Sequence, residues 1–452
     1  MGEKLDLHAT NPSREELLKY ENIPSELEEF NYFDDSLKKR EAEKEDFLEG
    51  KSYLPNYDYP RLSRLYDGFM TGNMRPMTHE KEYENLLNMK GQIYKAVQEL
   101  EIAAENEDIN SAEYKLYADF QERRYMQILL VEEAEKLRMN NSTENRTKFM
   151  ETNQRLFGAF NPEYFRDILD GTNTRIFDSE MIGNLGDIVK ERYRAELSTV
   201  PDTTDDVYYD AQQVADTMNQ AFQADGLAEK GWTAEIHPTK TIVAVNKVDK
   251  KLYLPRNTRR NASELKRLMV HEIGTHAIRA ENGLETGQKI LEFGTANYAD
   301  AEEGLGVIME CAVAGNFDNA SIDRAEERYI VAGFALGADG KTPRDARNTF
   351  EISWPIIAQR LAKGGEITDK IRETARTRTY NHIENAFRGT DMYMQGIIYS
   401  KLQIYYEGLV DNMKYFSGHA DDLEGALDRA MIGKYNHTSN DEYHTIEKLL
   451  NG

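Results

Sequence analysis

The chain has 452 residues, of which 40% are hydrophobic and 30% charged, and this composition excludes an intrinsically disordered or fibrous protein. It is too long for one ordinary hydrophobic core, so we expect two or three packed units. The 80 acidic residues outnumber the 56 basic ones and give a net charge of -24. This charge disfavours binding to nucleic acids and to anionic membrane surfaces.

The single cysteine, Cys311, excludes an internal disulfide and a zinc cluster built from thiolates. The first residues contain no apolar segment of signal-peptide length. The most apolar stretches, 307–315 and 330–337, are too short to span a bilayer. We therefore expect a soluble, cytoplasmic protein, and the sequence does not indicate its oligomeric state.

The chain before residue 201 divides into two regions. Residues 1–78 are polar and contain five prolines, which predicts an extended, partly ordered segment. Residues 79–200 show apolar side chains at spacings of three and four, which predicts a helical region broken near Asn161-Pro162 and Gly171. The polar stretch 198–206 is the predicted linker to a catalytic domain at 201–452.

The predicted catalytic domain combines helices with a small sheet. Asp210 opens a helix, with Gln213 as its capping-box partner. Three β-rich stretches at 232–237, 241–246 and 251–254 then predict a small sheet or hairpin. The chain from 303 to 450 is again mostly helical, so the expected fold class is α+β, mostly α-helical.

The helix after the sheet carries the most informative motif. Asn261 and Glu264 cap its start, and Asn282-Gly283 is expected to end it. It contains His271 and His276, a pair that also occurs by chance on ordinary helices. The glutamate beside His271 and the five-residue spacing of the histidines indicate a metal-binding role.

Glu272 directly follows His271, as in zinc hydrolases whose two histidines hold the metal while the glutamate activates a water. The histidines are five residues apart rather than four, which places them about 140° apart around a regular helix. A π-bulge returns them towards one face, and Gly274 between them has the necessary backbone freedom. We therefore predict a π-bulge between His271 and His276.

A catalytic zinc ion takes three protein ligands, and a second helix downstream commonly supplies the third. Glu302 and Glu303 are both candidates, although an acidic pair at a helix start also commonly serves the helix dipole. Glu310 lies two turns beyond Glu303 and shares its face, so it is a candidate to orient a histidine.

The six residues from His271 to His276, then Asn282-Gly283 and Glu303-Gly304-Leu305, resemble the family of the microtubule-associated tyrosine carboxypeptidase and its bacterial relatives. The resemblance covers roughly residues 205–415. It implies that His271, His276 and Glu303 bind Zn²⁺ and that Glu272 is the general base. The chain has Glu302 where the bacterial relatives have Gln, and Gly306 where they have Ala.

A second block, Arg388-Gly389 followed by residues 399–409, also resembles this family, with Leu402 in place of its usual Asp. A carboxypeptidase needs a cation to pair with the free C-terminal carboxylate of its substrate. It also needs a donor to support the developing oxyanion. Our candidates are Arg388 and Lys401 for the first role, and Tyr399 and Tyr405 for the second.

The expected protein is thus a zinc metallocarboxypeptidase that acts on the C-terminus of a peptide or protein. The resemblance implies an aromatic C-terminal residue, Tyr or Phe. The stretch 241–246 is expected to align the substrate as an added strand. Two alternatives stay open: a zinc endopeptidase or aminopeptidase, and a non-catalytic regulatory module that binds a metal.

Overall fold

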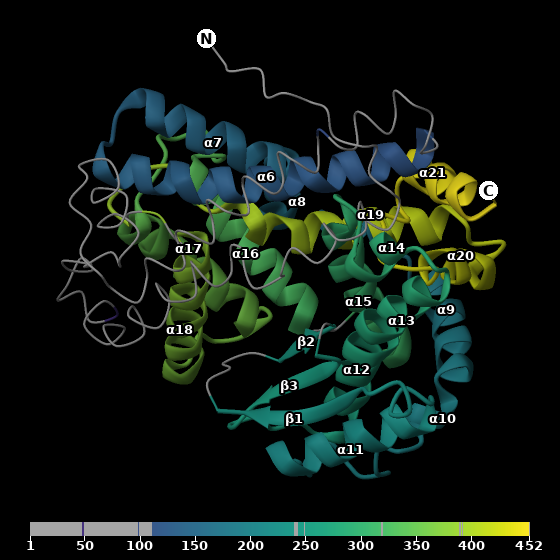
Figure 1. Cartoon of the computed structure of the whole chain (residues 1–452). Helices are drawn as coiled ribbons and strands as arrows, with labels where there is room; N and C mark the ends of the chain where they lie inside the picture. The colour runs from purple at the N-terminus through teal and green to yellow at the C-terminus, as the bar shows by residue number, and fades with distance from the viewer. Residues whose placement is uncertain are drawn as a thin grey trace. The chain divides into compact units, whose positions relative to one another are not determined.

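The fold is described from a computed structural model of the chain. The described residues are 111–451 without 239–242, 248, 318–319, 388–389 and 391, together with Leu48 and Gln98. The predictions for 1–78 and for the helix over 79–110 therefore lie outside the described residues, apart from these two. The described chain is mostly helical with one three-stranded sheet, which confirms the expected fold class (Figure 1). None of its helices is long and apolar enough to cross a membrane.

The chain forms two compact units. We call them the helical unit, 1–171 with 325–403, and the sheet unit, 172–324 with 404–452. The predicted boundary at 200/201 differs from these divisions and lies inside the sheet unit. The reason is local packing: the short helix α10 (Arg194–Leu197) packs against α9 (Ser179–Arg192), α11 (Ala211–Ala224) and α12 (Ala262–His271).

The helical unit shows the predicted helix breaks. Asn161 caps the start of a helix with Pro162 in its first turn, and Gly171 ends that helix with a φ of 67°. Both features match the usual positions of Asn, Pro and Gly at helix ends. Its described helices are α6 (Ser111–Met139), α7 (Thr143–Phe157), α8 (Pro162–Asp170), α17 (Ala346–Ala362), α18 (Asp369–Ala386) and the 3₁₀ helix η5 (Ser400–Gln403). The helix α16 (Ala320–Leu336) contains the division at 324/325.

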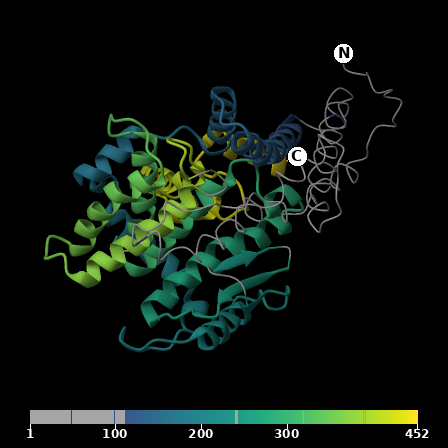
Figure 2. The same ribbon diagram turned by 90° about the vertical axis from the view of Figure 1, so that its left-hand side faces the viewer.

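The sheet of the sheet unit has the strand order β1-β3-β2. β1 (Thr233–His237) runs parallel to β3 (Lys251–Pro255), and β2 (Ala244–Asn246) is an antiparallel edge strand. These strands confirm the predicted sheet. Buried side chains of β1 and β3 pack into one apolar cluster with α11 and α12, which lie near the strands in Figures 1 and 2.

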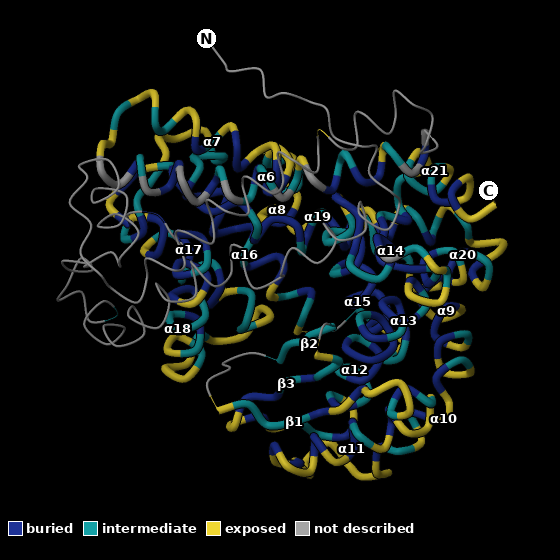
Figure 3. Tube along the Cα trace, in the orientation of Figure 1, coloured by how far each residue is buried: buried dark blue, intermediate teal, exposed yellow. Residues whose placement is uncertain are grey.

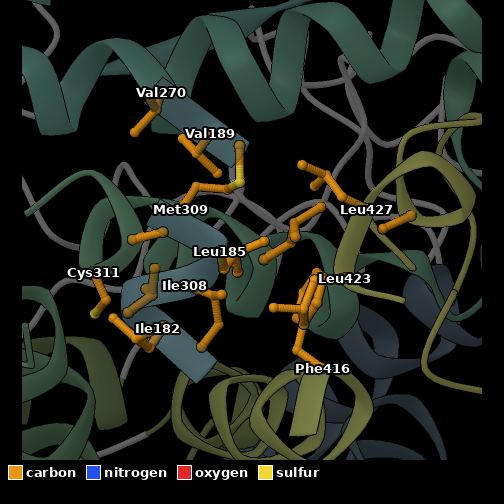
Figure 4. Close-up of a cluster of buried hydrophobic side chains, with 14 of the residues drawn as sticks. Ile182, Leu185, Val189, Val270, Ile308, Met309, Cys311, Phe416, Leu423 and Leu427 are labelled. Atoms are coloured by element: carbon orange, nitrogen blue, oxygen red, sulfur yellow. The ribbon is translucent and has the colours of Figure 1, made fainter. Parts of the chain in front are cut away.

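The helix α15 (Tyr298–Ala314) is the central element of the sheet unit. It packs against α9, α12 and α19 (Ile404–Gly418), and most of its residues are buried (Figure 3). Figure 4 shows the apolar cluster around it, in which Leu185, Ile308 and Phe416 come from three different helices. The remaining elements are the 3₁₀ helix η3 (Asn173–Ile176), the π-helical turn Glu272–Ala277, α13 (Ile278–Glu285), α14 (Lys289–Phe293), α20 (Leu423–Ala430) and α21 (Asn440–Asn451).

Both predicted capping boxes are present, Asp210 with Gln213 and Asn261 with Glu264. The expected helix end at Asn282-Gly283 is wrong, because α13 continues through both residues to Glu285. A Cβ on Gly283 would overlap the carbonyl group of Leu291, so this glycine allows a close approach inside the helix.

The crossing of α15 and α19 depends on glycine in the same way. A Cβ on Gly408 would overlap the carbonyl oxygen of Asp300, on α15. We expect Gly408→Ala to destabilise the protein by about 1–3 kcal/mol, since the helices must separate to admit the methyl group. Urea denaturation measures this change.

The matched control is Gly183→Ala in α9, where an added Cβ meets no atom within 4 Å. That variant should gain about 0.5–1 kcal/mol from helix propensity alone. If both substitutions stabilised the protein equally, the close crossing of α15 and α19 at Gly408 would be contradicted.

Candidate metal centre

The turn between the two histidines is π-helical. α12 leads into the π-helical turn Glu272–Ala277, and the helix then continues as α13. The hydroxyl of Thr275 donates to the carbonyl oxygen of Val270, five residues earlier, at 3.0 Å. The predicted π-bulge is thus confirmed, and the ring centroids of His271 and His276 lie 5.1 Å apart.

A tyrosine from another helix supports this turn. The hydroxyl of Tyr193, at the end of α9, donates to the carbonyl oxygen of Gly274 at 2.9 Å. A Cβ on Gly274 would lie 3.3 Å from the Tyr193 ring, tighter than an ordinary contact. Tyr193 is buried, and its burial raises the pKa of its phenol, so the hydroxyl keeps its proton and remains a donor.

Three side chains converge on one point in the sheet unit. One nitrogen each of His271 and His276 and one carboxylate oxygen of Glu303 lie within 4.8 Å of one another. Glu303 reaches this group from α15, which packs against both α12 and the π-helical turn. Two imidazole nitrogens and one carboxylate oxygen are a donor set typical of catalytic zinc sites.

Two other carboxylates contact Nδ1 of the two imidazoles. Glu310 contacts Nδ1 of His271 at 2.7 Å, and Glu302 contacts Nδ1 of His276 at 2.6 Å. An ionised carboxylate only accepts hydrogen bonds, so Nδ1 of each ring donates to it, and Nε2 is the nitrogen that would bind a metal ion, in place of any proton it carries. The contact of Glu310 with a histidine was expected from its spacing on the helix.

The geometry also distinguishes Glu302 from Glu303. Both oxygens of Glu302 are engaged: Oε1 with His276 and Lys434, and Oε2 with Arg279. Glu303, by contrast, belongs to the group of three converging side chains. Of the two candidates for the third ligand, Glu303 is therefore the one that the geometry favours.

The electrostatic setting follows from burial and from these pairs. Burial alone would lower the pKa of His271, but the hydrogen bond and charge of Glu310 outweigh it and raise the pKa to about 10. Burial opposes the ionisation of Glu302 too, yet Lys434, His276 and Arg279 hold its pKa well below the ordinary value. Burial raises the pKa of Glu272, against the pull of the two histidines.

The structure describes three of the other four predicted site residues. Tyr399 and Lys401 belong to the helical unit, where the Tyr399 ring is buried and packs edge-on against Phe157 at 5.3 Å. Tyr405 is the second residue of α19 in the sheet unit and is half-buried. Arg388 lies outside the described residues.

Sequence reasoning missed three basic residues of the sheet unit. Lys434 and Arg279 both contact Glu302. No motif surrounds Lys434, whereas Arg279 lies between His276 and Asn282-Gly283. Arg267 lies four residues before His271 on α12, so the two side chains share a helix face. The four-residue spacing from Arg267 to His271 could be identified from the sequence, whereas the contact of Lys434 with Glu302 could not.

A family model provides independent information on the chain. The model described as microtubule-associated tyrosine carboxypeptidase matches residues 87–336, more than half of the chain. The chain belongs to this family. Membership supports a carboxypeptidase enzyme, and the matched range contains His271, Glu272, His276 and Glu303. No curated protein and no solved structure matches the chain.

Proposed function

We propose that the protein is a zinc metallocarboxypeptidase that removes an aromatic C-terminal residue, tyrosine above all, from a peptide or protein. The observation that carries the metal assignment is the convergence of His271, His276 and Glu303 within 4.8 Å. The family description supports carboxypeptidase action and the tyrosine preference. Its reference to microtubules makes a tubulin C-terminus a candidate substrate.

The residues fit zinc in their chemistry and in their support. His271 and His276 would offer Nε2, and Glu303 a carboxylate oxygen, with Nδ1 of each histidine already engaged. A zinc ion held there would lower the pKa of a water molecule and polarise the scissile carbonyl group.

Glu272 is the proposed general base. It follows His271 directly and is 9% exposed, so it lies beside the ligand group with little access for bulk water. Its raised pKa suits a group that accepts a proton from the attacking water and then delivers it to the leaving amine.

The edge strand β2 is the proposed guide for the substrate backbone. β2 pairs only with β3 among the described strands, and it packs against the π-helical turn. A peptide added along its outer edge would pair through main-chain hydrogen bonds and pass beside the ligand group. Residues 241 and 242 of the predicted stretch lie outside the described residues.

Arg267 is the residue of the sheet unit that best suits the terminal carboxylate. It is half-buried, one helical turn before His271, and it forms no ion pair within the described part of the chain. An arginine pairs with a carboxylate through two parallel hydrogen bonds. Arg388 and Lys401 stay predictions for the same role, as Tyr399 and Tyr405 do for oxyanion support.

The test uses two peptides that end in tyrosine, one with a free carboxylate and one amidated. We expect the zinc-loaded chain to release tyrosine from the free acid and to leave the amide uncut, as followed by mass spectrometry. Arg267→Ala should lower kcat/KM on the free acid by about 10- to 100-fold, the usual worth of hydrogen bonds to a charged group.

Lys266→Ala is the matched control, since Lys266 is the neighbouring cation about 100° further around α12. It should cut the free acid as the unaltered chain does. Equal cleavage of acid and amide would identify an endopeptidase instead, and release from the N-terminus an aminopeptidase. An equal loss in both variants would remove Arg267 from the proposed site.

A further inference from the structure

The buried carboxylate of Glu302 meets two cations besides the histidine. Lys434 Nζ lies 2.6 Å from Oε1 of Glu302, and Arg279 Nη1 lies 3.3 Å from Oε2. The side chains of all three are at most 6% exposed. Water therefore does little to screen these charges, and each one depends on the others for compensation.

Lys434 comes from a loop near the C-terminal end of the chain. Its N–H donates to the carbonyl oxygen of Leu291 at 2.7 Å, and its carbonyl oxygen accepts from the N–H of Thr295 at 2.9 Å. Arg279 donates to the carbonyl oxygens on either side, Gly433 at 3.0 Å and Tyr435 at 2.7 Å. The backbone thus holds the Lys434 side chain in a fixed place.

We propose that Lys434 is a positioning residue of the metal centre. It acts through Glu302: the cation holds this carboxylate in place, and the carboxylate in turn fixes the Nδ1 proton and the ring orientation of His276. The inference rests on the proposed function, because it takes His276 to be a metal ligand. Lys434 also lies outside the residues 87–336 that the family model matches.

The charges explain why Glu302 needs the cation. With Glu302 present, loss of Lys434 leaves a buried carboxylate with Arg279 as its remaining cation among the described residues. Loss of Glu302 instead leaves two buried cations without their acceptor. Changing both residues removes one charge of each sign, and a neutral amide at position 302 requires no compensating charge.

The experiment compares zinc affinities measured by competition with a chelating dye. Lys434→Met should weaken zinc binding by about 10- to 100-fold, the usual effect of disturbing a group behind a metal ligand. Lys434→Arg keeps the charge and should retain most of the affinity. The double variant Glu302→Gln with Lys434→Met should bind zinc about as tightly as Glu302→Gln alone, because Lys434 acts through the carboxylate, and a merely structural lysine would not predict this.

Lys250→Met is the matched control. Lys250 also neutralises a buried glutamate of the sheet unit, Glu281, at 2.6 Å, but Glu281 accepts from the Trp232 indole instead of a histidine. This variant should keep the zinc affinity of the unaltered chain. Thermal unfolding of the metal-free proteins reports any general loss of stability.

The outcomes separate this inference from the proposed function. If the unaltered chain binds zinc and Lys434→Met binds it equally tightly, the positioning role is overturned and the proposed function stands. If the losses of Glu302→Gln and Lys434→Met multiply in the double variant, the positioning role is overturned as well. If the unaltered chain binds no zinc, the proposed function itself fails. Should Lys434→Met not fold, the comparison of the double variant with Glu302→Gln alone still decides, since a lower zinc affinity of the double variant overturns the positioning role.

Discussion

Glu272→Gln is expected to abolish most of the turnover while zinc remains bound. The amide keeps the shape of the side chain but cannot accept the proton of the attacking water, so kcat should fall by about 100- to 10,000-fold. Because the loss concerns the transition state, kcat and kcat/KM should fall together. Steady-state hydrolysis of the free-acid peptide, with zinc content measured on the same sample, checks both expectations.

The control for this variant is Glu285→Gln at the exposed end of α13. Glu285 pairs with Lys230 on the surface, and its side chain is 62% exposed. Its loss should change neither zinc content nor turnover, since exposed ion pairs contribute little. Undiminished hydrolysis by Glu272→Gln would remove the proposed base from the mechanism.

Glu303→Ala is expected to lose both zinc and activity. The variant removes one of three converging donors, and a catalytic zinc site rarely manages with two protein ligands. The loss of affinity should exceed the about 10- to 100-fold change typical of residues behind a ligand. Metal analysis after dialysis and the chelator competition measure it.

Glu302→Gln is the informative comparison for Glu303→Ala. Glu302 lies directly before Glu303 but contacts the back of His276, so its replacement should weaken zinc binding within that smaller range. The reverse order of effects would make Glu302 the ligand and would refute the assignment of Glu303.

Local chemistry made several features predictable. The five-residue spacing of the histidines required a widened helical turn if both rings were to face one ion, and that turn is present. The spacing of seven positions from Glu303 to Glu310 placed both on one helix face, and Glu310 does contact His271. In each case, the geometry of a single helix was sufficient.

Other features depend on segments that are distant along the chain. Lys434 contacts Glu302 across 132 residues, and Tyr193 contacts Gly274 across 81. No periodicity within either segment indicates the partner. Asn282-Gly283 has the composition of a helix end, yet the helix continues because Gly283 allows α13 to approach Leu291 closely. Tertiary packing overrides local propensity at this position.

The π-helical turn has a consequence for how such sites are recognised across proteins. The common His-Glu-x-x-His motif has one residue fewer between its histidines than this chain. The π-helical turn accommodates the additional residue, so both histidines face the same side although α12 and α13 stay aligned. A single-codon insertion at this place can therefore preserve a binding pair that a fixed-length search pattern no longer detects. Searches that allow either length, combined with a downstream Glu-Gly-Leu triplet, should reveal further members of this group of hydrolases.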